Sequence, residues 1–266
     1  MQKKKILGIA LIIIIFLGLA GTIIYVFTEL KEENDIRIQN INTTDAKNFK
    51  SEYEELNDKE VKEGVKYRTL NIDENNPIKY ITASDLITKM DNKESFVVYF
   101  GFNSCPWCRT IIEPLLKSAS KNGISTIYYV DIKNIRDKYE LNDDNEAVKT
   151  TEGTEGYYQL LTKFNSVLSE YKPLEYKTTK TVKGKKKTVT VKVDIDEKRI
   201  YAPNVVLVKN GKPIQLTTGI SDNIEDPYKE LTEEEINYSI SEFDKLFKSI
   251  VTTTTSENIC TGESNC

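Results

Sequence analysis

The chain opens with one long apolar stretch and continues with short apolar segments separated by polar residues. Residues 6–27 contain no charged side chain, and a helix rising about 1.5 Å per residue would extend about 33 Å over them, enough to cross a bilayer core. Lysines occupy positions 3–5 and acidic residues follow from Glu29, so the positive-inside rule leaves the N-terminus in the cytoplasm. This pattern predicts a cytoplasmic segment at 1–5 and a single-pass signal anchor at 6–27, with the remainder outside the cell membrane.

A cleaved signal peptide is the alternative interpretation of the apolar stretch. The stretch is longer than the usual core of a signal peptide and lacks a clear small-x-small cleavage site. The residues that follow it are polar and show no sustained periodicity, which is typical of a stalk. We therefore expect a stalk at 28–47, a folded domain at 48–251 and a flexible, Thr/Ser-rich tail at 252–266.

The folded part alternates strand-like and helix-like patterns. Residues 96–102 are apolar, β-branched and aromatic, as in a strand buried on both faces. Residues 106–120 carry apolar side chains at helical spacing, and 124–131 again favour a strand, so a parallel crossover unit in an α/β fold with a central mixed sheet and one core is predicted. The same patterns predict a short helix with Phe49, Tyr53 and Leu56, strands at 67–72 and 78–81, a helix from Ser84 or Asp85 through Met90, a hairpin of 205–208 and 213–216 around Asn210-Gly211, and a closing helix with a capping box of Thr232 and Glu235.

Further elements are expected between Asp131 and Pro203. Residues 157–171 have apolar positions at helical spacing and predict an amphipathic helix. Residues 176–195 alternate Val189, Val191, Val193 and Ile195 with polar neighbours and turn at Lys183-Gly184-Lys185, which predicts a long hairpin. The lysines at its tip are interpreted either as a contact to an acidic partner or anionic lipid, or as a solvated turn.

Two cysteines that can form a redox-active pair follow the predicted strand at 96–102, where the predicted helix begins. They belong to the segment Cys105-Pro106-Trp107-Cys108. Unpaired N–H groups and the dipole at a helix start stabilise a thiolate, so Cys105 is the expected nucleophile. Cys108 follows about one turn later, faces inward and can resolve a mixed disulfide. The pair therefore predicts thiol-disulfide exchange and a Cys105–Cys108 disulfide in the oxidised form. Its direction stays open, because it depends on the relative stability of the dithiol and the disulfide.

Two other interpretations of the motif are weighed against exchange. A C-x-x-C pair can form half of a zinc site, but the chain has no histidine and its other cysteines, Cys260 and Cys266, are far away at the C-terminus. An inert structural disulfide is also possible, although it gains nothing from a helix start that activates one thiol. A net charge of −4 without a basic face of interleaved aromatic residues excludes nucleic-acid binding.

At this motif the chain resembles the thioredoxin superfamily, and more closely the membrane-anchored thioredoxin-like proteins of Gram-positive bacteria that include bacteriocin-transport accessory proteins. The resemblance covers roughly residues 78–250. It implies a thioredoxin fold in which 132–200 form an insertion. Its motifs are Tyr99-Phe100-Gly101-Phe102-Asn103-Ser104-Cys105-Pro106-Trp107-Cys108-Arg109, with Pro114 as a helix kink, and Tyr201-Ala202-Pro203-Asn204-Val205-Val206-Leu207-Val208-Lys209-Asn210-Gly211-Lys212.

The resemblance also implies roles for residues near the cysteines. Pro203 would be a cis-proline packed against the two sulfurs, whereas without the motif it would simply begin an edge strand. Ala202 would offer backbone hydrogen bonds to an extended substrate. Trp107 would supply an apolar contact to the substrate, or else pack on the domain surface. The chain departs from thioredoxin at Ser104, at the Pro-Trp pair and at Tyr99, which stands where thioredoxin keeps a buried aspartate.

The sequence thus predicts a membrane-anchored, extracellular thiol-disulfide oxidoreductase that acts on protein thiols and disulfides, needs no metal or organic cofactor, and has an unidentified electron partner. Cys260 and Cys266 are expected to pair with each other, or to shuttle electrons to the Cys105-Cys108 pair. The alternatives are a secretion or assembly accessory module that binds clients through the same fold without redox turnover, and a zinc-binding ectodomain.

Overall fold

The structure, a computed structural model, describes residues 43–182 and 185–257. Its centre is a mixed five-stranded sheet with the order β11-β10-β4-β5-β3. β4 runs parallel to β5 and antiparallel to β10, β3 is parallel to β5, and β11 is antiparallel to β10. The bounds of these strands are β3 Ile78–Tyr80, β4 Phe96–Gly101, β5 Ile127–Asp131, β10 Asn204–Lys209 and β11 Lys212–Thr217.

β4 is the middle strand because its side chains are apolar on both faces. All six of its residues are buried. Val97 and Tyr99 point into one core, while Val98 and Phe100 point into the core on the opposite side of the sheet. The predicted crossover from β4 through α4 (Pro106–Lys121) to β5 and the predicted hairpin of β10 and β11 are confirmed.

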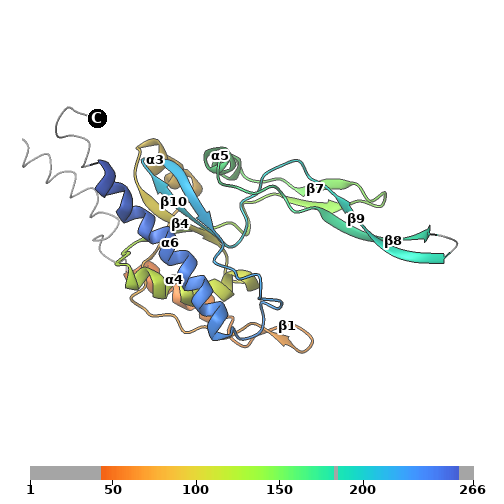
Figure 1. The fold of residues 1–266 in the computed structure, drawn as a ribbon, viewed down its shortest axis with the longest axis horizontal. Helices are drawn as coiled ribbons and strands as arrows, with labels where there is room; N and C mark the ends of the chain where they lie inside the picture. Colours follow the sequence, from red (N-terminus) through yellow and green to blue (C-terminus); the bar gives the residue numbers. More distant parts are fainter. Residues whose placement is uncertain (1–42, 183–184, 258–266) are drawn as a thin grey trace, which may run out of the picture.

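Helices cover the sheet on both faces, so the body has three layers (Figure 1). On one face lie α2 (Thr43–Glu54), α4 and α6 (Glu233–Glu257), with Phe49 and Phe243 among their buried residues. On the other face lie α3 (Ala83–Asp91) and α5 (Glu155–Phe164), with Leu86 and Phe164 buried. The expectation of a single core is wrong, because a sheet that is apolar on both sides buries one cluster against each helical layer.

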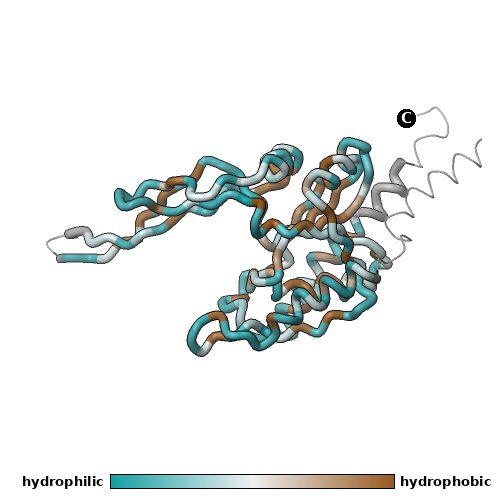
Figure 2. Tube along the Cα trace, turned by 180° about the vertical axis from the view of Figure 1, so that it is seen from behind, coloured by the Kyte–Doolittle hydropathy of each residue, from teal (hydrophilic) through white to brown (hydrophobic). Residues whose placement is uncertain are grey.

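Two hairpins extend away from the body as an arm (Figure 1). The longer one confirms the hairpin predicted for 176–195, and apolar and polar positions alternate along the arm (Figure 2). The shorter one was not expected, because its strands are brief and largely exposed. A third small hairpin lies near the start of the body. The bounds are β6 Lys138–Leu141 with β7 Ala147–Thr151, β8 Leu174–Val182 with β9 Lys185–Val193, and β1 Glu60–Lys62 with β2 Val65–Lys66.

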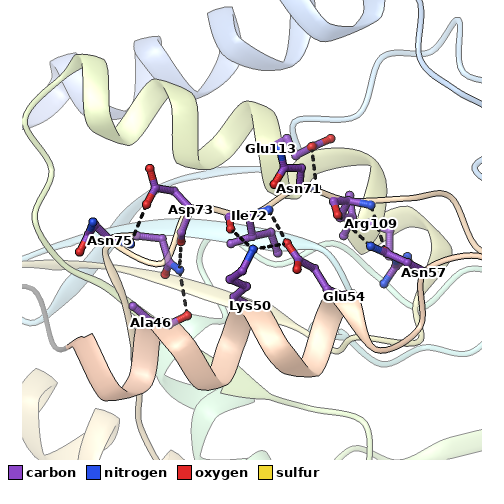
Figure 3. A network of polar contacts seen from close by, with 12 residues as sticks. Ala46, Lys50, Glu54, Asn57, Asn71, Ile72, Asp73, Asn75, Arg109 and Glu113 are labelled. Carbon is purple, nitrogen blue, oxygen red and sulfur yellow. Dashed lines mark hydrogen bonds and ion pairs between the residues drawn. The ribbon is translucent and has the colours of Figure 1, made fainter.

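The strand expected at 67–72 is absent, since this segment runs as a loop beside α2 (Figure 3). Side chains form hydrogen bonds with the backbone groups that would pair with a neighbouring strand in a β-sheet. The N–H of Leu70 donates to Asn57 Oδ1 at 3.0 Å, and the N–H of Ile72 donates to Glu54 Oε1 at 2.7 Å. Lys50 Nζ in turn donates to the carbonyl of Ile72 at 2.7 Å. The apolar side chains of Leu70 and Ile72 still reach the core, which explains why the sequence pattern resembled a strand.

Several predicted boundaries also differ. α2 begins at Thr43 rather than after the expected stalk, because Ala46 extends its buried face, and α6 continues past Val251 into the expected tail. α5 ends at Phe164, and Leu168 packs on the core from the turn that follows.

Within 43–182 and 185–257 no helix is long and apolar enough to cross a membrane. The predicted anchor at 6–27, the hairpin turn at 183–184 and Cys260 and Cys266 fall outside these ranges.

Candidate functional site

Cys105 lies at the N-terminus of α4, directly after β4 and a short loop. It is the N-cap residue, with φ −80° and ψ 116°, and its Sγ accepts a hydrogen bond from the backbone N–H of Cys108 at 3.4 Å. Pro106 occupies the first turn, where a missing N–H costs no helical hydrogen bond. The expected helix-start position of Cys105 is therefore confirmed.

The loop before β10 contacts Cys105 through the backbone of Ala202. The Ala202–Pro203 peptide bond is cis, as the resemblance implied. The Cys105 thiol donates a hydrogen bond to the Ala202 carbonyl at 3.3 Å. Ala202, which was expected to offer its backbone to a substrate, thus has its carbonyl engaged by the reduced cysteine. A thiolate has no proton to donate, so ionisation of Cys105 would release this carbonyl.

The surroundings of Cys105 favour its ionised form. A hydrogen bond from the Cys108 thiol lowers the pKa of Cys105, and the backbone N–H groups of Cys108 and Trp107 and the positive charge of Arg136 lower it further. Burial acts in the opposite direction without cancelling these effects. The Cys105 side chain is 6% exposed, so it keeps only a narrow opening to solvent. This combination favours the ionisation of a thiol that is itself largely buried.

Cys108 has the opposite character. It is 0% exposed, and burial raises its pKa well above that of an ordinary thiol, with the neighbouring Cys105 adding to the effect. Both residues are free cysteines, so the structure shows the dithiol form. The two thiols are therefore unequal, since Cys105 favours the thiolate and Cys108 keeps its proton.

A pair of buried tyrosines lies behind Cys108. The hydroxyls of Tyr99 on β4 and Tyr53 on α2 are 2.9 Å apart, and Tyr99 partly offsets the effect of burial on the pKa of Cys108. Both tyrosines are 0% exposed. Sequence reasoning noted only that Tyr99 replaces an aspartate and placed Tyr53 on a helix, because no local pattern shows that they meet.

Arg109 anchors the start of α4 (Figure 3). Its guanidinium is fully buried and donates to the carbonyl of Tyr53, to Oδ1 of Asn57 and to the carbonyl of Arg68, each at 2.7 Å. These bonds fix the helix that carries both cysteines to α2 and to the loop at 67–72. A basic residue directly after a C-x-x-C motif is the only signal of this role in the sequence.

Aromatic side chains lie close to the segment that carries Cys105. Trp107 is partly buried and packs against the core, so both interpretations of it, surface packing and substrate contact, remain compatible with its position. The Tyr67 hydroxyl donates to the carbonyl of Ser104 at 3.3 Å, and its ring lies 6.2 Å from that of Tyr228. Tyr228 lies on the loop before α6. Burial raises its pKa, and the charges of Tyr67 and Cys105 raise it further.

In the part of the chain that the structure describes, no three His, Cys, Asp or Glu side chains gather as a metal site would require. Comparisons with family models, curated proteins and solved structures give no match to this chain. The function must therefore be argued from the geometry of the site.

Proposed function

We propose that this protein is a thiol-disulfide oxidoreductase that exchanges disulfides with protein substrates through Cys105 and Cys108. The observation that carries the proposal is the inequality of the two thiols, one favouring the thiolate at a helix N-terminus and one buried and protonated beside it. Exchange needs this division, because the nucleophile must ionise readily while the resolving thiol keeps its proton until the mixed disulfide has formed.

We also propose that the domain has a thioredoxin-type fold and stands outside the cytoplasm on an N-terminal anchor. The fold proposal is supported by the sheet order, by the crossover through α4 and by the cis bond at Pro203 facing Cys105. The anchor proposal rests on the apolar residues 6–27 alone.

In the reducing direction, the Cys105 thiolate attacks a client disulfide and forms a mixed disulfide, and the first client sulfur departs as a thiolate. Cys108 then loses its proton and attacks Cys105 Sγ, which releases the second client sulfur. The client disulfide gains two electrons and two protons, and the cysteine pair is oxidised to a disulfide. The reverse sequence donates the disulfide to a client.

The client would bind across the rim formed by Trp107, Tyr228 and the Ala202–Pro203 loop. Ionisation of Cys105 frees the Ala202 carbonyl, which can then accept a hydrogen bond from the backbone of an extended client. Recognition of this kind uses main-chain groups and is compatible with many client sequences.

Replacing Cys108 by alanine tests the proposal. A Cys108→Ala variant should accumulate mixed disulfides with client proteins through Cys105, visible as adducts on non-reducing gels that disappear with reductant. The Cys105→Ala variant, matched in size and background, should form none. Equal adduct levels in the two variants would contradict the assignment of the nucleophile.

A secretion or assembly accessory module is the second candidate, favoured by the arm of β6–β9, which projects from the body in a way that exchange chemistry does not require (Figure 1). In that case a variant lacking both cysteines of the motif would retain full function in the cell. An oxidoreductase would lose it.

A further inference from the structure

We propose, building on the exchange function proposed above, that Arg68 forms a carboxylate-binding subsite beside the segment that carries Cys105. Glu230 occupies this subsite in the free protein, and an acidic group of the client displaces it.

Arg68 is a buried cation with an incomplete set of partners. It lies in the loop at 67–72, and its side chain is 5% exposed. Its Nη2 donates to Glu230 Oε2 at 3.3 Å, whereas its Nε and Nη1 are buried and have no hydrogen-bond partner among the residues that the structure describes. The N–H groups of a guanidinium form a planar fork that suits both oxygens of a carboxylate. Arg68 therefore offers more donors than Glu230 uses.

Glu230 is a weakly held occupant of the subsite. Its side chain is 75% exposed, and its hydrogen bond to Arg68 is longer than the range of about 2.7–2.9 Å that is usual between charged groups. An ion pair with one partner in water contributes little to stability. Because the Glu230 side chain reaches Nη2 from the surface, a second carboxylate can take its place without opening the body of the domain.

The subsite is fixed to the start of α4, which carries the cysteines. The hydroxyl of Tyr67, the residue before Arg68, donates to the carbonyl of Ser104 at 3.3 Å. The Arg68 carbonyl accepts a hydrogen bond from Nη2 of Arg109 on α4 at 2.7 Å. An extended client linked to Cys105 advances by about 3.3 Å per residue, so we expect the recognised carboxylate within a few residues of the client cysteine.

The loop before α6 supplies both the occupant and an aromatic contact. The ring of Tyr228 lies 6.2 Å from that of Tyr67, and Glu230 follows on the same loop. Other acidic side chains of this loop, such as Glu225, are exposed. Exposed charges are screened beyond about 8 Å at physiological salt, whereas a buried charge is screened much less. We therefore expect contact with Arg68, and not the overall field of the loop, to set the selectivity.

The test measures how fast Cys105 attacks peptides that carry one cysteine. The full-length chain is used with Cys260 and Cys266 replaced by serine, and each peptide cysteine is joined as a disulfide to a neutral pyridine thiol whose release is coloured. The Cys105 thiolate forms a bond with the peptide sulfur while the bond to the pyridine sulfur breaks, and the departing pyridine thiolate takes up a proton from water.

Two sets of peptides distinguish the sources of the carboxylate. One set has blocked ends and carries either glutamate or glutamine at successive positions on either side of the cysteine. The other set lacks glutamate and ends in a free carboxylate at the same distances. A preference confined to the second set would identify the recognised group as a chain terminus, and a preference in the first would identify it as a side chain.

In the parent protein we expect the carboxylate peptide to react about tenfold faster than its neutral counterpart at the spacing that reaches Arg68, because a hydrogen bond to a charged group is gained. Glu230→Ala empties the subsite and should increase this ratio several-fold. Arg68→Gln should abolish the preference. The matched control is Glu225→Ala, which removes the same charge from the same loop and should leave the ratio as in the parent.

Glu230→Ala carries the test if Arg68→Gln does not fold, because the Glu230 side chain is exposed. The absence of a preference at every spacing in both the parent and Glu230→Ala would overturn the subsite, and so would an equal increase of the ratio in Glu225→Ala. If the parent instead reacts with every peptide as slowly as an ordinary thiol, the exchange function is overturned, while the ratio between the paired peptides still decides the subsite.

Discussion

Adding a single methyl group at Gly101 should dislodge Tyr99, and its cost can be worked out from the structure. The Cβ of Gly101→Ala would lie 2.1, 2.3 and 2.7 Å from Oη, Cζ and Cε2 of Tyr99. These atoms belong to a rigid ring that is packed against Tyr129, so the ring cannot yield by a small torsion. Either it leaves its position or β4 shifts.

Three contributions set the magnitude. Overpacking a core in this way costs about 1–3 kcal/mol. Displacing the Tyr99 hydroxyl breaks its hydrogen bond with Tyr53 and leaves a buried hydroxyl unpaired, which adds about 1–3 kcal/mol. Replacing glycine by alanine within a strand stabilises the folded state by about 0.5–1 kcal/mol, which offsets part of this cost. We expect Gly101→Ala to lower the free energy of unfolding by about 3 kcal/mol.

The sign should reverse when the ring is removed. In a Tyr99→Leu background none of the three clashing atoms exists, so Gly101→Ala should be neutral or stabilise by up to about 1 kcal/mol. Urea unfolding of the four proteins in the reduced state gives the coupling energy of the cycle. An equal cost of Gly101→Ala in both backgrounds would show that Gly101 is needed for some reason other than the Tyr99 ring.

Three further predictions concern the anchor of the motif, its nucleophile and the closing helix. Arg109→Met leaves the Arg68 carbonyl without its donor and removes one of two donors from the Tyr53 carbonyl and from Asn57 Oδ1, so it should lower the free energy of unfolding in urea by about 2–4 kcal/mol, with Arg109→Lys intermediate; a loss below about 1 kcal/mol would contradict the anchoring role. The alkylation rate of Cys105 should reach half its maximum below the pH of about 8.5 typical of a free cysteine, and Arg136→Gln should move that midpoint upward; a profile centred on the ordinary value would refute activation of this thiol. Burial raises the pKa of Asp244, but hydrogen bonds from Lys121, Ser118 and Asn122 outweigh it and leave the pKa lowered, so the stabilisation is complete above about pH 3.9 and is lost as the pH falls through the folded-state value. Asp244→Asn should therefore flatten the acid limb of the stability curve measured by urea unfolding, and an unchanged limb would mean that this carboxylate does not couple α6 to α4.

The elements that the sequence predicts correctly are those whose pattern is complete within a few residues. β4 is a continuous apolar run, α4 has its cap, its proline and its apolar spacing, and the β10–β11 hairpin has Asn210-Gly211 at its turn. The loop at 67–72 has the same local signature as a strand, yet its backbone donors bond to Asn57 and Glu54. A window along the chain contains no information about such partners.

The same limit applies to the candidate site. Cys105, Cys108 and Pro203 belong to motifs, and the structure brings the two cysteines and the Ala202–Pro203 bond together. Arg136 lies in the segment after β5, and only the folded chain brings its charge near Cys105. Motif spacing identifies the two candidate thiols, whereas the groups that shift their pKa come from separate elements.

Tyr99 shows why a tuning residue can be hidden by a pattern that is otherwise correct. An aromatic residue in a buried strand is expected to be packing, and the ring of Tyr99 does pack on Tyr129. What distinguishes it is the glycine two positions later on the same face, which leaves no Cβ in the space that the ring occupies. An aromatic residue and a glycine at this spacing form a local signal for a ring that lies across the strand, and here the hydroxyl of that ring lies 2.9 Å from the hydroxyl of Tyr53. The Gly101 and Tyr99 variants of the unfolding cycle test whether the glycine is needed to accommodate this ring.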